Sequence, residues 1–238
     1  MRVNKSITLF SVFFFILFAL FGLYWLYRFD LPNISELKDY HPKQMNRIFS
    51  ADKDLIGTFG VENRIVVPLE KVPRQTTLAF IAAEDRKYFE HPGFDWASIM
   101  RCLIKNQMAG KIVCGGSTIT QQTVKSLLKN SSKLYGRKVR ELLLALQLEQ
   151  SLTKEEILAI YLNEIFFGNG AYGIEVASFT YFNKHSSELL LHESALLAGI
   201  IQNANLHNPI SQPERALNRR AYVLNNMLSA QFITKNEY

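Results

Sequence analysis

An uncharged run of 21 residues near the N-terminus, Ile7–Tyr27, constrains the fold of this chain more than any other feature. A run of this length and apolarity can cross a bilayer, and there it must be a helix, because lipid offers no partners for backbone groups. Arg2 and Lys5 precede the run, and the charges that follow it cancel. The positive-inside rule therefore predicts a cytoplasmic tail over residues 1–6, a transmembrane anchor over residues 7–27 and an extracytoplasmic remainder.

A cleavable signal peptide is the alternative interpretation of this run. A signal peptide has a shorter apolar region, and small residues lie ahead of its cleavage site. The run instead ends in the bulky, aromatic segment Leu23–Tyr27, which is typical of the membrane interface. We therefore favour an uncleaved anchor.

Composition limits the rest of the chain to one domain with a sizeable core. The 238 residues leave room for one globular domain with appendages, and 48% of them are hydrophobic. The formal net charge of +6 favours an anionic partner such as lipid, phosphate or nucleic acid. Cys102 and Cys114 form neither a disulfide framework nor a zinc-binding spacing, so we predict two unpaired thiols rather than a bridge.

The extracytoplasmic part divides into a short β-containing entrance and a long helical body. Residues 28–60 read as a polar tether with a small β element, residues 61–228 as the globular domain, and residues 229–238 as the start of a linker or a C-terminal tail. We expect strands over residues 47–50, 55–59 and 64–68, and helices over residues 75–89, 95–108, 117–129, 135–151, 154–163, 171–182, 187–202 and 213–230. The predicted fold class is therefore mainly α.

The stretch Glu84–Gly93 is the first cluster of ionisable residues. It contains three carboxylates, two cations, a histidine and two aromatics between an apolar run and a Pro-Gly turn. Such a stretch favours a polar cleft over a core. A carboxylate held partly out of water can have its pKa raised enough to act as a base near neutral pH. Glu84, at the end of the apolar run, is the candidate.

A second cluster, Gly115–Gln122, joins two glycines to a Ser/Thr-rich helix start. Glycines allow a ligand to approach the backbone, and a helix start presents free amides and hydroxyls to an anion. Taken alone, however, the segment favours an ordinary helix cap.

A basic run follows this cluster, with no acidic residue between positions 125 and 140. A solvated basic face usually has counter-charges nearby, so this run favours a diphosphate or an anionic headgroup as its ligand. Nucleic acid is the alternative, and the predicted anchor argues against it by placing the run outside the cytoplasm. The basic positions are Lys125, Lys129, Lys133, Arg137, Lys138 and Arg140.

Glu141 ends the basic run and opens an apolar helix. A lone glutamate there is usually a first-turn acid stabilised by the helix dipole, but its place after six cations favours a role in the site. The chain thus offers two separated carboxylates, Glu84 and Glu141, as glycosidic-bond chemistry requires. The cations next to Glu141 suit a diphosphate leaving group.

These segments resemble the motifs of the peptidoglycan glycosyltransferases, or transglycosylases, found in class A penicillin-binding proteins and in monofunctional biosynthetic enzymes. Glu84–Gly93 and Gly115–Gln122 are similar to the first two motifs, and Arg137–Glu141 is similar to the third. Lys154–Asn163 and Arg219–Leu224 are similar to the fourth and fifth. The five occur in the family's order.

The resemblance implies a lysozyme-like glycosyltransferase fold, and polymerisation of lipid II at the outer face of the bacterial cytoplasmic membrane. Lipid II and the growing strand, both linked to polyprenyl diphosphate, would be joined by a β-1,4 bond formed with inversion. The partners implied are these substrates, the membrane and other cell-wall synthesis proteins, with no nucleic acid and no organic cofactor.

The resemblance also implies roles for individual residues. Glu84 would be the general base for the GlcNAc 4-hydroxyl, and Glu141 would position the cations or a divalent cation such as Mg²⁺ on the donor side. Lys133 departs from the arginine of some members, and it keeps the charge but loses the bidentate fork. The residues expected to bind sugar or diphosphate are Arg86, Ser117, Thr118, Gln121, Gln122, Lys125, Lys133 and Arg137. Residues expected to brace helices are His91, Lys154, Tyr161, Asn163 and Arg219.

Two other functions are alternatives. A lysozyme-like glycan hydrolase needs a protonated carboxyl at the leaving oxygen and has little use for six cations. A non-catalytic, membrane-anchored lipid-binding module would need no base. A transpeptidase site is not predicted, because the chain contains no Lys-Thr-Gly. We expect either a stand-alone glycosyltransferase or the N-terminal piece of a longer enzyme.

Overall fold

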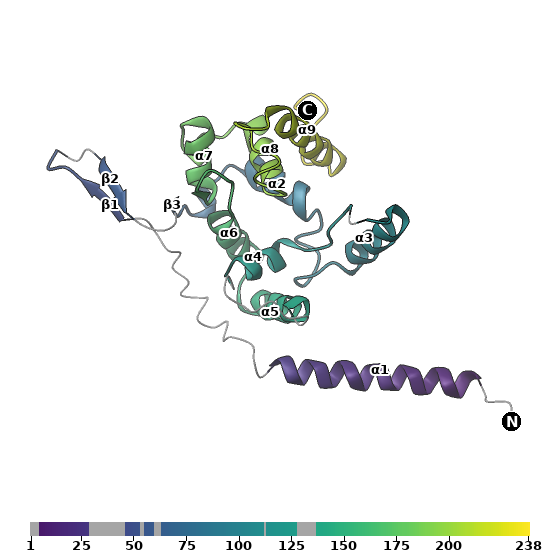
Figure 1. Ribbon diagram of the computed structural model, residues 1–238. Coiled ribbons are helices and arrows are strands. Elements are labelled where there is room, and N and C mark those ends of the chain that lie inside the picture. The colour runs from purple at the N-terminus through teal and green to yellow at the C-terminus, as the bar shows by residue number, and fades with distance from the viewer. Residues whose placement is uncertain (1–4, 29–45, 53–54, 60–62, 112, 128–136) are drawn as a thin grey trace.

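The computed structural model describes residues 5–28, 46–52, 55–59, 63–111, 113–127 and 137–238. In this part of the chain a helical body runs from α2 to α9, and α1 and a two-stranded sheet lie apart from it (Figure 1). The prediction of a mainly α body with a small β element at its entrance is confirmed.

The elements follow one another in the predicted order. The N-terminal elements are α1 (Lys5–Arg28), β1 (Asn46–Phe49), β2 (Leu55–Phe59), β3 (Asn63–Arg64) and the short 3-10 helix η2 (Leu69–Lys71). The first half of the body contains α2 (Arg74–Glu84), α3 (Trp96–Ala109), α4 (Ile119–Leu127), α5 (Arg137–Ser151) and α6 (Lys154–Glu164). The second half contains β4 (Ala171–Tyr172), α7 (Ile174–Phe182), η3 (Ser186–Glu188), α8 (Leu191–Ile200) and α9 (Pro213–Ser229).

The predicted anchor, residues 7–27, lies within α1, which exposes large apolar side chains between Phe10 and Trp25. Among the residues that the structure describes, no helix is both long enough and apolar enough to cross a membrane. The transmembrane part of the fold prediction is therefore not confirmed.

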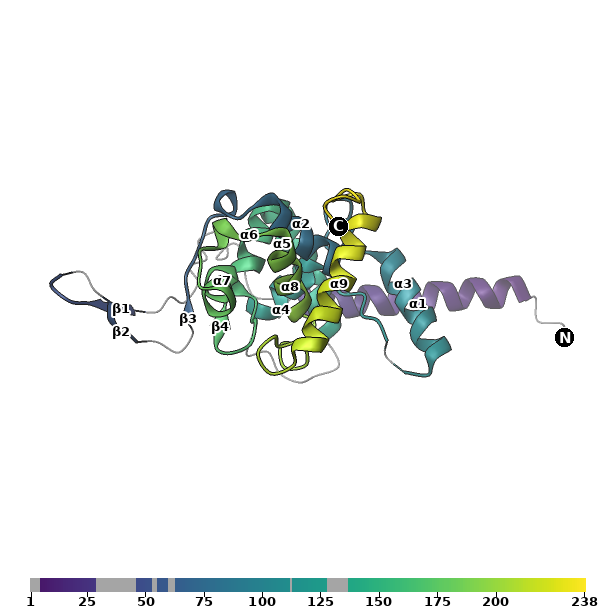
Figure 2. The same ribbon diagram turned by 90° about the horizontal axis from the view of Figure 1, so that it is seen from above.

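The core of the body joins two groups of helices. α2 packs against α8 and α9, and α4 packs against α5 and α6 (Figures 1 and 2). Phe80 of α2 connects the groups, because its buried ring meets the rings of Tyr161 and Phe167 edge-on, at centroid distances of 6.4 and 5.9 Å. Edge-to-face contacts fix orientation as well as burying area, so they set the direction in which α2 ends.

The helix predicted over residues 75–89 is wrong at its C-terminal end. α2 stops at Glu84, and Asp85 leaves the helical conformation, with φ at −157° and ψ at 77°. The Asp85 side chain leaves the helix to accept hydrogen bonds from His91 and from the backbone of Ile119. Ile119 is 34 residues away from Asp85, and His91 lies in the turn that follows. The helical pattern of residues 75–89 therefore did not indicate the break.

The β element is smaller than predicted. β1 and β2 form the expected antiparallel hairpin. Of the third predicted strand, residues 64–68, only Arg64 pairs; together with Asn63 it forms β3, which runs parallel to β4. Farther along, the Asn163 side chain takes the place of a strand partner. Its Oδ1 accepts from Val67 N and its Nδ2 donates to Val67 O, both at 2.9 Å. The expected bracing role of Asn163 is confirmed.

Cys102 and Cys114 form a disulfide, with their Cα atoms 5.4 Å apart, so the prediction of two unpaired thiols is wrong. The chain reverses after α3, where Gly110 adopts the left-handed conformation with φ at +62°. The reversal returns Cys114 to the side of the helix that carries Cys102. Spacing in the sequence does not show this reversal.

Candidate active site

Glu84 ends α2, and its Oε2 accepts a 2.7 Å hydrogen bond from Gln122 Nε2 of α4. Burial raises the pKa of Glu84, while the Gln122 hydrogen bond and the positive charge of Arg219 oppose the rise. A carboxylate desolvated in this way is a stronger base than one in water. The first and second motifs therefore meet at the predicted base. We call Glu84 and Gln122 the base cluster.

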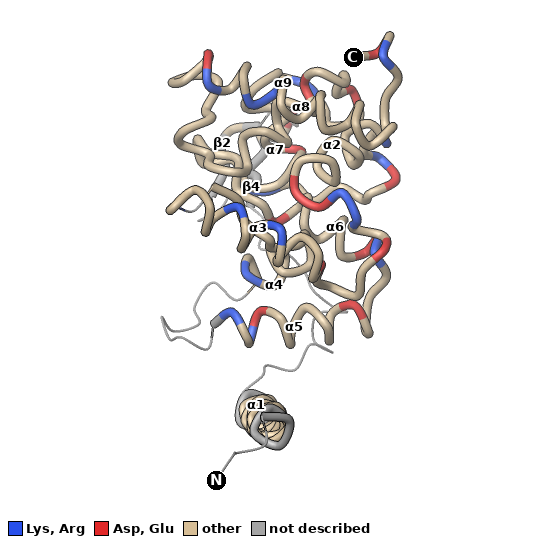
Figure 3. Tube along the Cα trace, turned by 90° about the vertical axis from the view of Figure 1, so that its right-hand side faces the viewer, with Lys and Arg blue, Asp and Glu red and all other residues tan. Residues whose placement is uncertain are grey.

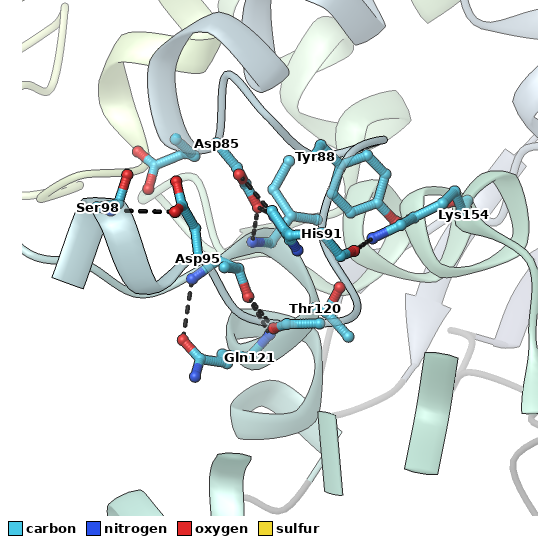
Figure 4. Close-up of polar contacts among 12 residues, drawn as sticks. Asp85, Tyr88, His91, Asp95, Ser98, Thr120, Gln121 and Lys154 are labelled. Carbon is cyan, nitrogen blue, oxygen red and sulfur yellow. Dashed lines mark hydrogen bonds and ion pairs between the residues drawn. The ribbon is translucent and has the colours of Figure 1, made fainter. Parts of the chain in front are cut away.

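Asp85, the next residue, is buried and serves the scaffold (Figure 4). Both of its carboxylate oxygens lie 2.9 Å from His91 Nε2, and Oδ2 also accepts from Ile119 N at 3.1 Å. Ile119 is the first residue of α4, so Asp85 satisfies a free amide at the start of that helix. The structural hydrogen bond expected of His91 is confirmed, and it holds the carboxylate that positions the helix of Gln122.

Thr118 and Gln121 complete the start of α4. Thr118 N donates to Gln121 Oε1 at 3.0 Å, and Gln121 N donates to Thr118 Oγ1 at 3.2 Å, in the manner of a capping box. Thr118 Oγ1 also donates to the Gly93 carbonyl at 2.6 Å. Both side chains are buried. The structure places these two predicted substrate ligands in a helix cap, and their contact with substrate stays a prediction.

A second polar network, formed by residues of α4, α5 and α6, supports the turn after α2. Lys154 Nζ donates to the His91 carbonyl and to Glu149 Oε1, both at 2.7 Å, and lies 4.6 Å from the centre of the Tyr88 ring. Thr120 Oγ1 donates to the same Glu149 oxygen at 2.6 Å. The bracing role expected of Lys154 is confirmed. Glu149 was missed, because its partners Thr120 and Lys154 come from two other helices, α4 and α6.

A group that we call the cation cluster, Ser117, Lys138 and Glu141, lies at the start of α5. Lys138 Nζ donates to Glu141 Oε2 at 2.7 Å and to Ser117 Oγ at 3.1 Å. Glu141 is buried, whereas the Lys138 side chain is 62% exposed. The cluster joins the second motif to the third. Lys138 was not among the predicted ligands, although its i,i+3 spacing from Glu141 is a signal for this pair.

The other predicted cations are distributed around this cluster. Lys125 is exposed near the end of α4, and no described residue pairs with it. Figure 3 shows the basic positions at the end of α4 and at the start of α5 on the same side of the body. Lys129 and Lys133 lie outside the described residues, as does the side chain of Arg137.

Two arginines, Arg86 after α2 and Arg219 of α9, lie near the junction of these helices. Arg86 Nη2 donates to Asn226 Oδ1, and Asn226 Nδ2 donates to the Ala82 carbonyl at 3.3 Å, so this pair fastens α2 to α9. The guanidinium of Arg219 lies 4.3 Å from the centre of the Tyr222 ring. The predicted contact of Arg86 with substrate stays a prediction.

The described residues form no ready-made cluster of ligands for a divalent cation. No group of three or more His, Cys, Asp or Glu side chains is placed to hold a metal among the described residues. Glu141, the predicted ligand, already accepts from an ammonium. Glu141 and Lys138 thus form a lysine-neutralised carboxylate, and a divalent cation at this position stays a prediction from the sequence.

A family model described as Transglycosylase matches residues 52–228. This chain belongs to the transglycosylase family. It is 43% identical over 209 residues to penicillin-binding protein 1A of Aquifex aeolicus, covering 88% of this chain and 29% of that protein. Its identity to penicillin-binding protein 1A of Neisseria flavescens is 43% over 204 residues, covering 86% of this chain and 26% of that protein.

A solved structure also matches this transglycosylase. The crystal structure of penicillin-binding protein 1A from Haemophilus influenzae aligns with a TM-score of 0.47 and 28% identity, covering 84% of this chain and 20% of that chain. The chain thus spans less than a third of the length of these relatives. The family model and the identities to the two relatives confirm the resemblance found in the sequence, at the level of the family.

Proposed function

We propose that this domain polymerises lipid II into β-1,4-linked glycan strands with inversion, releasing polyprenyl diphosphate. The observation that carries the proposal is the base cluster: a desolvated Glu84 carboxylate at a helix end, oriented by the Gln122 amide at 2.7 Å. Desolvation raises the basicity of Glu84 toward the range in which a carboxylate can accept a proton from a sugar hydroxyl.

In the proposed reaction Glu84 takes the proton of the acceptor's 4-hydroxyl. The hydroxyl oxygen forms a bond to the anomeric carbon of the donor sugar, and the bond from that carbon to the diphosphate oxygen breaks. The electron pair of the broken bond leaves with the diphosphate. One displacement inverts the anomeric centre, so no covalent glycosyl-enzyme is formed.

The cation cluster and Lys125 are the proposed seat of the diphosphate. A departing diphosphate needs charge stabilisation more than it needs a proton. Lys138 is held at 2.7 Å from Glu141 yet keeps most of its side chain in solvent, so its ammonium can serve a second anion. Lys133 and Arg137 are proposed partners from the same basic run. A magnesium ion, if used, would take most of its ligands from the diphosphate and water.

A glycan hydrolase is less well supported by this geometry. Hydrolysis with inversion needs a carboxylic acid that gives a proton to the leaving oxygen. Glu141, the second carboxylate of the site, is buried and accepts a hydrogen bond from an ammonium. That arrangement suits a carboxylate that orients cations, and a sugar leaving group has little use for the basic run beside it.

We also propose that the domain works at a lipid surface, on the outer side of the cytoplasmic membrane. α3 exposes an apolar stripe that is suited to lipid contact, because its members recur at helical spacing around a tryptophan. The stripe comprises Trp96, Met100, Leu103, Ile104 and Met108. The disulfide supports a location outside the reducing cytoplasm. The single-pass anchor over residues 7–27 stays a prediction from sequence.

The test is polymer formation from labelled lipid II by the purified chain in detergent. The proposal expects glycan polymer from the unmodified protein and none from the Glu84→Gln variant, which should still bind lipid II. Release of soluble sugar from preformed glycan would favour the hydrolase. Binding of lipid II without any polymer, with Mg²⁺ present, would favour a non-catalytic module.

A further inference from the structure

The segment 113–117, which leads into the second motif, runs along one face of α3. Asn106 acts as a side-chain template for it: Oδ1 accepts from Val113 N at 2.8 Å and from Cys114 N at 3.0 Å, and Nδ2 donates to Cys114 O at 3.0 Å. The amide thus holds the segment at three backbone atoms. Residues 113–117 belong to no helix or strand, so these side-chain hydrogen bonds take the place of regular backbone pairing.

The disulfide fastens the same residue to the same face of the helix. Cys102 lies one turn before Asn106, and both side chains reach Cys114. Ile99 lies one turn before Cys102, and its backbone packs against Gly116. A Cβ at position 116 would come within 2.9 Å of Ile99 Cα, so only glycine fits this contact without a shift. Ile99, Cys102 and Asn106 recur at helical spacing, so the three contacts form one seam.

The seam matters because α3 has no buried residues of its own. Its other face carries the apolar stripe, and it projects from the body in Figures 1 and 2. A helix with few buried contacts opens locally at low cost unless it is fastened by other means. Asp95 caps its first turn through Ser98 N at 3.1 Å, and the seam fastens its later turns.

The segment also reaches the proposed donor side. Ser117 directly follows the clamped residues, and its Oγ accepts from Lys138 Nζ at 3.1 Å, next to Glu141. A displacement of residues 113–116 would carry Ser117 away from the cation cluster. Misplacement by about 1 Å in a group that orients substrate can lower a rate by up to roughly a hundredfold.

We propose that the Cys102–Cys114 disulfide and Asn106 together clamp the segment 113–117 onto α3, so that the helix and the donor-side loop form one unit that positions Ser117 for the diphosphate. Residues of the clamp are positioning residues, because they act through Ser117 and do not touch the substrate. The effect of the clamp on catalysis rests on the proposed function, whereas the clamp as a structural unit does not. The outer face of the same unit is the apolar stripe, so contact of α3 with lipid would also set the position of the loop.

The first experiment measures the clamp without any substrate. Amide hydrogen exchange is followed for residues 113–118 in the oxidised protein, in the protein reduced with a phosphine, and in the Cys102→Ser/Cys114→Ser double variant. Exchange should be faster in the latter two, while amides of α2, α8 and α9 keep their rates. Equal exchange at residues 113–118 in all three samples would overturn the clamp.

The second experiment measures its consequence, as the rate of polymer formation against lipid II concentration. Reduction should raise KM by about tenfold with a smaller change in kcat, and reductant should have no effect on the double variant, which is the matched control. Asn106→Ala, with the disulfide intact, should show a partial effect in the same direction.

The two failures are distinguishable. Faster exchange with an unchanged KM would overturn the positioning role while the enzyme itself remains active. Absence of polymer from every form would instead count against the proposed function, and hydrogen exchange would then decide on the clamp alone. A reduced protein whose helices α2, α8 and α9 also exchange faster would show a general structural role in place of a local clamp.

Discussion

The base cluster and the cation cluster are built on opposite physical principles. Glu84 and Gln122 lie at the junction of α2 and α4, where burial raises the pKa of the carboxyl and a buried aspartate fixes the helix that carries its partner. Lys138, in contrast, is 62% exposed. One cluster depends on desolvation, which salt does not change. The other depends on charge in water, which salt screens. The difference implies that proton abstraction at Glu84 and departure of the diphosphate at the cation cluster can be impaired separately.

The largest expected effect is that of Glu84→Gln. Loss of a general base lowers the rate by roughly a hundred to ten thousand times, while lipid II binding is kept. The measurement is polymer formed per enzyme at saturating lipid II. Glu90→Gln is the matched control, because this exposed glutamate belongs to the same motif and forms an ion pair with Lys87 at the surface. A Glu84→Gln protein with more than a tenth of the normal rate would contradict the assignment of the base.

The same variant tests desolvation through stability. The pKa of Glu84 is higher in the folded than in the unfolded protein, so the folded state binds this proton more tightly. Ionisation of Glu84 therefore lowers stability as pH rises above the unfolded value of about 4.3 and through the raised folded value. At pH 7 the neutral glutamine should leave the free energy of unfolding unchanged or higher, as measured by urea denaturation. A marked loss of stability would contradict the proposed desolvation.

Asp85→Asn should give the reverse combination. An asparagine at this position would place an NH₂ donor against His91 Nε2 in place of the second acceptor oxygen, and it would remove the negative charge at the start of α4. We therefore expect the free energy of unfolding to fall by about 2 kcal/mol. Activity should fall by about tenfold as α4 loosens and Gln122 moves. Urea denaturation and the polymerisation assay measure the two effects. Normal stability with full loss of activity would instead make Asp85 a chemical participant.

A smaller effect is expected at the exposed cations. Lys125→Ala should raise KM for lipid II by roughly tenfold at low salt and by less at high salt, with no change in thermal stability. Lys235→Ala, at an exposed position near the C-terminus, is the control for a general loss of charge. An effect of Lys125→Ala that does not depend on salt would remove Lys125 from the proposed diphosphate seat.

The smallest effect is a shift in pH dependence. The hydrogen bond from Gln122 lowers the pKa of Glu84 against the larger effect of burial. Gln122→Met removes the donor at similar size, so the pKa of Glu84 should rise further and the acid limb of kcat/KM should move to higher pH, by less than about one unit. Gln150→Met, on the exposed side of α5, should leave the profile in place. A shift to lower pH would contradict the role of Gln122.

Sequence reasoning singled out both carboxylates and the basic run as candidates, because the proposed chemistry requires those residue types in those motifs. It was less successful with side chains whose partners are distant in the chain. Thr118 and Gln121 are polar residues of the kind that bind sugar or phosphate, and only the structure shows that they form the N-terminal cap of α4. The disulfide was missed because the reversal after Gly110 cannot be inferred from a spacing of 12 residues.

The sequence by itself determined the family, the helical body and the identity of the base candidate, since helical periodicity and motif order are local properties of the chain. Only the tertiary structure decided which residues support that base. Glu84 and Asp85 are adjacent carboxylates in the sequence, yet one meets the Gln122 amide and the other caps α4. The physical reason is that the partners which distinguish the two, Gln122 and the backbone of Ile119, belong to α4 and lie 34 or more residues away. The local pattern cannot reveal which neighbours the fold provides.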